Sequence, residues 1–75
     1  MNQKDKKIIE DSEARGIPIF VLTAKDAVTL STLDKYKALC KAEECPQSHI
    51  SEIGERIDEF KEWQKNNPGQ VKLPD

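Results

Sequence analysis

A continuous apolar run stands out along this otherwise polar chain. It spans residues 17–22 and reads Ile-Pro-Ile-Phe-Val-Leu. Isoleucine, phenylalanine and valine favour extended backbone, and a proline suits the start or the edge of a strand because it lacks an N–H group. The run does not alternate with polar residues, so both of its faces need cover. We therefore predict an extended apolar arm at 17–22, with no second strand in the sequence to pair with it.

The segment before the arm has the character of a short helix. Residues 4–15 contain good helix formers, and Gly16 stands where a glycine commonly ends a helix in the left-handed conformation. The apolar content is thin, chiefly Ile8 and Ile9, and a helix this short is marginal in water by itself. We predict a helix at about 4–15 that docks through these two isoleucines.

A second helix is predicted at about 24–44. Thr23 and Asp26 have the spacing of a capping box, with aspartate in place of the more usual glutamate. Apolar residues then recur at steps of three or four, which places them on one helix face. The stripe is Ala27, Leu30, Leu33, Tyr36 or Lys37, then Leu39 and Cys40. Pro46 ends the helix, because the residue before a proline is disfavoured in the helical region.

The third predicted helix, at about 48–66, has the clearest amphipathic pattern. Ser48 is a suitable N-cap residue. The apolar stripe consists of Ile50, Ile53, Ile57, Phe60 and then Trp63 or Gln64. Gly54 lies beside this stripe, where it is either tolerated at a cost of about 1 kcal/mol or allows a second helix to approach closely. Residues 67–75 form a short tail that either lies extended over the fold or is flexible.

These elements predict a mainly α protein with one small domain over residues 1–75. The short link makes the two long helices antiparallel neighbours, so the chain is a helical hairpin preceded by a short helix and an arm. Of its 75 residues, 36% are hydrophobic and 35% are charged. Because domains this small usually need disulfides, a metal or oligomerisation, we expect a homo-oligomer, with a dimer as the first choice. The predicted interface residues are Ile19, Phe20, Val21, Leu22 and Trp63.

Charge and hydropathy narrow the class of partner. The net charge is −2, with acidic and basic residues mixed along the chain, so a nucleic-acid partner is not expected. No apolar stretch approaches the roughly 18–20 residues that span a bilayer, so we expect no membrane partner. Residues 1–15 are charged where a signal peptide would be apolar, and we expect a cytosolic protein.

Few side chains in this sequence are candidates for metal ligands or catalytic groups. A zinc site takes four ligands, whereas Cys40, Cys45 and His49 supply three, so a metal would also need Glu44 or a second chain. Reduced thiols are the ordinary state of cytosolic cysteines. No nucleophile and base are paired in a way that indicates catalysis. We therefore expect no catalytic residues, no metal and no cofactor, and hence no enzymatic activity.

The sequence offers one candidate anion site, at the start of the second predicted helix. Free amides after Thr23, together with Lys25 and Arg15, are suited to a phosphate or a carboxylate. The alternative is that Thr23 and Asp26 already satisfy these amides as a cap, which is the ordinary use of such residues. In an oligomer, two such helix ends meeting at a symmetric interface would form a pocket.

Two motifs resemble those of small phage and prophage proteins. The segment 15–26 contains the pattern PIFVL-x-A-x-D before a leucine-rich helix, and residues 60–68 follow the pattern F-x-x-W-Q-x-x-N-P. The resemblance covers most of residues 13–75. It implies a phage accessory protein and assigns no role to any residue.

Two functions follow from these expectations. The first is a non-enzymatic accessory protein that works as a small helical homo-oligomer and binds or sequesters a protein or a small anionic ligand. An antagonist of host defence in the host cytosol would fit this size and charge. The alternative is a structural virion or assembly component that docks its apolar arm onto a larger protein.

Overall fold

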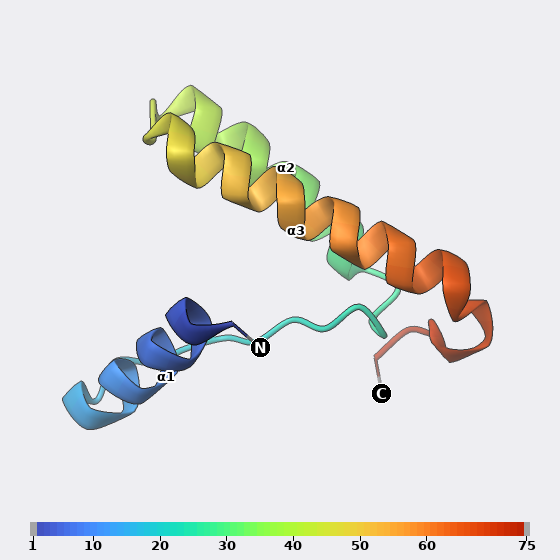
Figure 1. Cartoon of the computed structure of the whole chain (residues 1–75), viewed down its shortest axis with the longest axis horizontal. Coiled ribbons are helices and arrows are strands. Elements are labelled where there is room, and N and C mark those ends of the chain that lie inside the picture. Colours follow the sequence, from blue (N-terminus) through green and yellow to red (C-terminus); the bar gives the residue numbers. More distant parts are fainter. Residues whose placement is uncertain (1, 75) are drawn as a thin grey trace.

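The computed structural model describes residues 2–74, which form a mainly helical chain (Figure 1). The elements are α1 (Gln3–Arg15), α2 (Thr29–Ala42), α3 (Gln47–Asn66) and a short 3-10 helix, η1 (Pro68–Gln70). The described residues contain no strand, and the only β-type pairing among them is an isolated parallel bridge between Asp26 and Lys72. The predicted fold class, mainly α with a helical hairpin, is confirmed.

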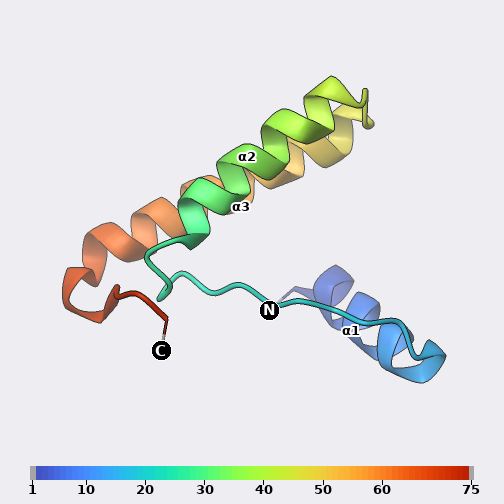
Figure 2. The same ribbon diagram turned by 180° about the vertical axis from the view of Figure 1, so that it is seen from behind.

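The hairpin contains the core of the molecule. Helices α2 and α3 run side by side in opposite directions in both views (Figures 1 and 2). The buried apolar residues are Cys40, Ile50, Ile53 and Ile57, and Leu30, Leu33 and Cys45 pack against them. The three isoleucines confirm the predicted stripe of α3.

On α2 the contact face is narrower than the sequence indicated. Leu30, Leu33 and Cys40 lie on the seam with α3, whereas Tyr36 and Leu39 are 48% and 64% exposed. The spacing explains the difference, because positions 30, 33, 37 and 40 follow one stripe of a helix with 3.6 residues per turn. Tyr36 and Leu39 each lie one residue to the side of it. From the edge of this face the Tyr36 hydroxyl still reaches His49 Nε2 of α3, at 3.1 Å.

The fourth position of this stripe is Lys37, which lies over Gly54 of α3. A Cβ atom added at Gly54 would meet only the end of the Lys37 side chain, with Nζ 3.1 Å away. A lysine can lay its aliphatic stem along a helix surface and keep its charge in water. Gly54 therefore faces a flexible side chain and not the backbone of α2.

The second helix begins at Thr29, five residues later than predicted. The amides that would open an earlier helix have other partners. Asp26 N–H donates to Thr23 O at 3.2 Å, Val28 N–H donates to Asp26 Oδ1 at 2.7 Å, and Ala27 N–H donates to Lys72 O at 2.9 Å. Thr29 is fully buried, and its hydroxyl donates to Thr23 O at 2.8 Å. Residues 23–28 therefore form a turn between the arm and α2, called the joint below.

The tail lies against the joint. Lys72 N–H donates to Lys25 O at 3.0 Å, which completes the parallel bridge. From α3, the Gln64 side chain donates to Ala24 O at 3.0 Å. Of the two placements left open by the sequence, the structure describes the extended one over the fold for residues 71–74.

At the other end of the hairpin, a tight link joins α2 to α3. Glu44 adopts the left-handed conformation with φ of 56°, and Cys45 N–H donates to Cys40 O at 2.9 Å. Helix α3 begins at Gln47, directly after Pro46, so Ser48 lies inside the helix and is not its N-cap as predicted. A proline before the first helical residue is favourable because its missing N–H would have no partner there.

Helix α1 ends at Gly16 as the sequence predicts, and it begins at Gln3, one residue before the predicted start. The Asn2 side chain accepts from Asp5 N–H at 2.8 Å, and Gly16 ends the helix with φ of 67° while Ile17 N–H donates to Ser12 O at 2.9 Å. The helix stands apart from the hairpin in both views (Figures 1 and 2). The N-terminal third of the chain thus projects from a two-helix body.

Replacement of Gly54 by alanine is expected to stabilise the hairpin by about 1 kcal/mol, because alanine has the higher helix propensity. The new methyl group would meet only the mobile end of Lys37. Urea denaturation followed by circular dichroism measures this change. Gly69→Ala is the control, since Gly69 lies outside the α-helices with open space around it and should change stability little. A destabilised Gly54→Ala protein would contradict the placement of Lys37.

Candidate functional site

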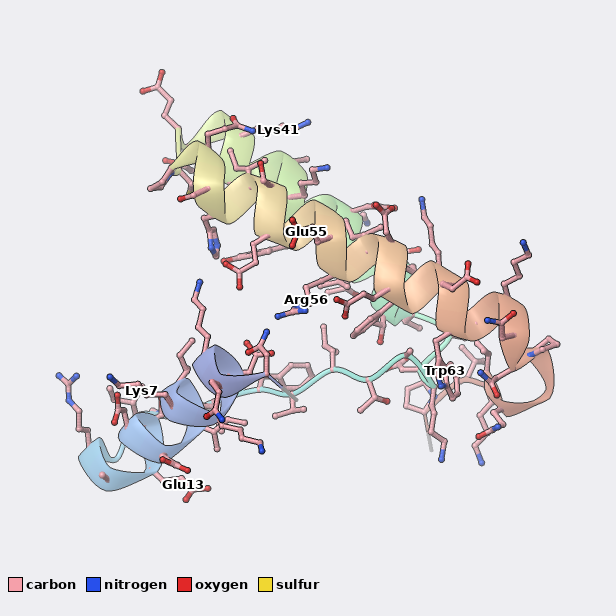
Figure 3. The ribbon with its side chains drawn as sticks, viewed as in Figure 1. Lys7, Glu13, Lys41, Glu55, Arg56 and Trp63 are labelled. Atoms are coloured by element: carbon pink, nitrogen blue, oxygen red, sulfur yellow. The ribbon has the colours of Figure 1, made fainter. Side chains whose placement is uncertain are left out.

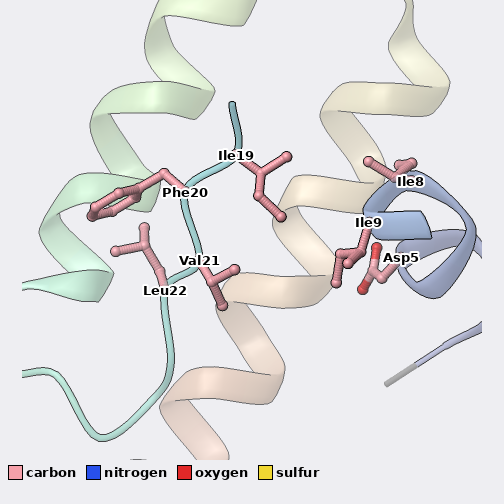
Figure 4. Close-up of a pocket in the computed structure, with 7 residues that line it drawn as sticks. All are labelled: Asp5, Ile8, Ile9, Ile19, Phe20, Val21 and Leu22. Atoms are coloured by element: carbon pink, nitrogen blue, oxygen red, sulfur yellow. The ribbon is translucent and has the colours of Figure 1, made fainter. Parts of the chain in front are cut away.

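The arm at 17–22 is extended and largely exposed. Phe20 is 85% exposed and Val21 62%, while Leu22 is partly buried. Figure 4 shows that the side chains alternate: Ile19 and Val21 lie toward α1, and Phe20 and Leu22 point to the opposite side. This alternation is the geometry of a β-strand, although the arm pairs with no other segment within residues 2–74.

A shallow groove separates the arm from α1. Its volume is about 280 Å³, and its walls are Asp5, Ile8 and Ile9 on one side and residues 19–22 on the other (Figure 4). Ile8 remains 51% exposed and Ile19 44% exposed. Helix α1 therefore covers one face of the arm only in part and leaves Phe20 uncovered.

The backbone of the arm is held at both ends and open between them. Ile17 N–H is bound to Ser12 O, and Thr23 O accepts from both Asp26 N–H and the Thr29 hydroxyl. Among the described residues, no hydrogen bond is formed by the backbone N–H or C=O groups of four arm residues, Ile19, Phe20, Val21 and Leu22. Exposed, unpaired strand edges of this kind are templates for pairing with another chain.

The predicted interface residues thus fall in two places. Ile19, Phe20, Val21 and Leu22 lie together on the arm, and Trp63 lies on α3, partly buried (Figures 3 and 4). The Trp63 carbonyl accepts from the Asn67 side chain at 2.8 Å, which secures the end of α3. Ile8, which the sequence placed in a docking contact, is half exposed beside the arm and belongs to the same apolar surface.

Two ion pairs connect α1 to α3. Lys4 Nζ lies 2.6 Å from Glu52 Oε2, and Arg56 Nη2 lies 3.7 Å from Asp5 Oδ2. Figure 3 shows Arg56 on the side of α3 that faces α1, where Glu59 also binds it at 3.1 Å. The hydrogen bond from Lys4 holds the pKa of Glu52 below its usual range. The position of α1 against the hairpin thus depends on polar contacts that are partly exposed.

The predicted anion-binding residues are not brought together. Arg15 ends α1 at the tip farther from the hairpin in both views (Figures 1 and 2). Thr23 and Lys25 line an open hollow of about 430 Å³ with Asp26, Lys72 and part of the tail. The helix N-terminus on which the prediction depended begins instead at Thr29. Lys72 is a second cation at this hollow that the sequence did not indicate, because only the fold brings the tail to the joint.

The cysteines and the histidine have ordinary structural surroundings. Cys40 is buried and Cys45 partly buried, and both are free. A hydrogen bond with the Cys40 side chain raises the pKa of Cys45, which favours the protonated, less nucleophilic thiol. His49 Nε2 lies 3.1 Å from the Tyr36 hydroxyl, and the two rings meet edge to face. Within residues 2–74, no three His, Cys, Asp or Glu side chains are placed to hold a metal ion.

Comparison of the chain with protein-family models, with curated proteins and with solved structures gives no match. None of the helices within residues 2–74 combines the length and the apolar character needed to cross a membrane. The arm, the groove beside it and the hollow at the joint are therefore the features on which a function can be argued.

Replacement of Lys4 by methionine is expected to raise the pKa of Glu52 toward that of an ordinary glutamate, because the Lys4 hydrogen bond is the main cause of its lowering. Because the pKa of Glu52 is lowered in the folded protein, its contact with Lys4 stabilises the fold at neutral pH. This stabilisation is lost as the pH falls through the lowered pKa and the carboxylate becomes protonated. An NMR titration of the Glu52 carboxyl group measures the shift.

Lys7→Met is the matched control, because Lys7 lies on the same helix and forms no ion pair among the described residues. An equal effect of the Lys4 and Lys7 substitutions would show that general charge, and not the α1–α3 contact, lowers this pKa.

Proposed function

We propose that this chain is a non-enzymatic binding module that works as a small helical homo-oligomer, with a dimer as the basic unit. The observation that carries the proposal is the amount of surface the single chain leaves open. A compact monomer of 8.5 kDa is expected to expose about 4,650 Å². This chain exposes 5981 Å², about 1,300 Å² more than that expectation.

The shape of the chain supports the same proposal. Its radius of gyration is 13.7 Å, against about 11.3 Å for a compact 75-residue domain. The difference arises because α1 and the arm project from the hairpin (Figure 1). A dimer that covered the excess surface of both chains would bury about 2,600 Å², which lies within the range of obligate homodimers.

The binding role is proposed from the surfaces beside the arm. The hollow at the joint is open and carries Lys25 and Lys72, which suit a small anionic ligand. The exposed arm suits an apolar protein surface. By the resemblance of its motifs, we propose a phage accessory protein that binds or sequesters a host protein or an anionic signal in the host cytosol.

A second candidate is a structural virion or assembly component that docks through the arm. It is favoured by the unpaired backbone at 19–22, which would also add to a strand of a larger protein. In this case the chain alone should be unstable or aggregate, whereas a cooperative thermal transition of the chain alone would favour the homo-oligomer.

Substitution of Phe20 by aspartate is expected to dissociate the oligomer, because it places a charge in the most exposed apolar position of the arm. Native mass spectrometry of the protein purified from its own cell context measures subunit number and any retained ligand together. Leu39→Asp is the matched control, since Leu39 is 64% exposed but lies on α2. A wild-type protein that is monomeric at micromolar concentration would contradict the proposal.

A further inference from the structure

We infer that two copies of this chain associate by pairing their arms as an antiparallel two-stranded ribbon, with the two Phe20 side chains opposite each other at the twofold axis. This inference rests on the proposed homo-oligomer and names the surface that forms it. The occupant of the open arm is a second copy of the same arm.

The composition of the arm suits a second copy. Residues 16–24 contain no charged side chain, so two arms meet without like-charge repulsion. In a twofold dimer the same surface of each chain meets its own copy, so that surface must be complementary to itself. A neutral apolar strand is complementary to a second copy of itself. The arm is already extended, and its two ends are fixed by Gly16 and the joint, so little further ordering is needed for pairing.

The free backbone N–H and C=O groups determine which edge of the arm pairs with the second copy. In an extended strand, alternate residues direct their N–H and C=O groups to the same edge. Pro18 shares its edge with Phe20 and Leu22 and has no N–H to donate. The edge formed by Ile19 and Val21 has all four groups free. Pairing through this edge therefore leaves no proline in the ladder.

The free backbone groups also determine the register in which the two arms align. Ile17 N–H is already bound to Ser12, and Thr23 O is bound to Asp26 and Thr29, so neither group is free for a ladder. When Ile19 pairs with Val21 of the second copy, and Val21 with Ile19, each free backbone N–H and C=O group of these two residues forms a hydrogen bond. Phe20 then lies opposite Phe20 in a position without mutual hydrogen bonds, where Cα atoms are about 4.5 Å apart and side chains are in contact.

Side-chain placement agrees with this register. Ile19 and Val21 face α1 on one side of the ribbon, while Phe20 and Leu22 occupy the other (Figure 4). Both α1 helices thus cover the same face, and the half-exposed Ile8 of each chain lies beside the groove there. An isolated two-stranded ribbon is marginal in water, and a covering helix supplies the packing it needs.

Cysteine cross-linking tests the register. In a Cys45→Ser background, which keeps the buried Cys40, Phe20→Cys should form a disulfide-linked dimer on mild oxidation. We expect it to cross-link at least about tenfold faster than Leu39→Cys or Val21→Cys, because only residue 20 lies directly opposite itself. Circular dichroism of each variant confirms that the helices remain.

Native mass spectrometry, together with the cross-linking rates, distinguishes a failure of arm pairing from a failure of the homo-oligomer. A dimer by native mass spectrometry in which Phe20→Cys cross-links no faster than Leu39→Cys would overturn arm pairing and leave the homo-oligomer standing. A monomer at all concentrations would overturn both.

Amide exchange of the unmodified protein provides a second measurement. The amides of Ile19 and Val21 should exchange more slowly than those of Phe20 and Leu22, and equal rates at all four would contradict the ladder.

Discussion

The hairpin encloses only a small apolar core. Within residues 2–74 the buried apolar side chains are Cys40, Ile50, Ile53 and Ile57, all of them in the hairpin. Two antiparallel helices can enclose one such seam and no more. The N-terminal third of the chain therefore has no core of its own to enter. Most of its large apolar residues stay exposed, and Ile9 and Leu22 are only partly buried. Under the proposal above, a second copy of the chain covers them.

The joint determines how that surface is presented. Thr29 is buried beneath the turn, the Asp26 carboxylate holds the start of α2, and Lys72 bridges the turn to the tail. These contacts connect three separate parts of the sequence at the point where the arm leaves the hairpin. The ion pairs of Lys4 and Asp5 connect the start of α1 to α3. The arm is thus displayed in an extended conformation between two fixed ends.

Much of this arrangement could be predicted from the sequence, because it follows from local rules. The isoleucine spacing of α3, the glycine that ends α1 and the proline before α3 each act within a few residues. The late start of α2 could not be predicted, because the amide of Ala27 is taken by a residue 45 positions along the chain. The pair of Lys4 with Glu52 and the hollow with Lys72 were missed for the same reason. Exposed charges carry no signal that identifies distant partners.

In the proposed homo-oligomer, a second copy covers the surface that the hairpin cannot. The most direct measurement is the thermal unfolding of the unmodified chain over a wide range of protein concentration. Because association stabilises a folded state by mass action, the account predicts a Tm that rises by several degrees over about a hundredfold increase in concentration. A Tm independent of concentration, with a single cooperative transition of a monomer, would contradict it.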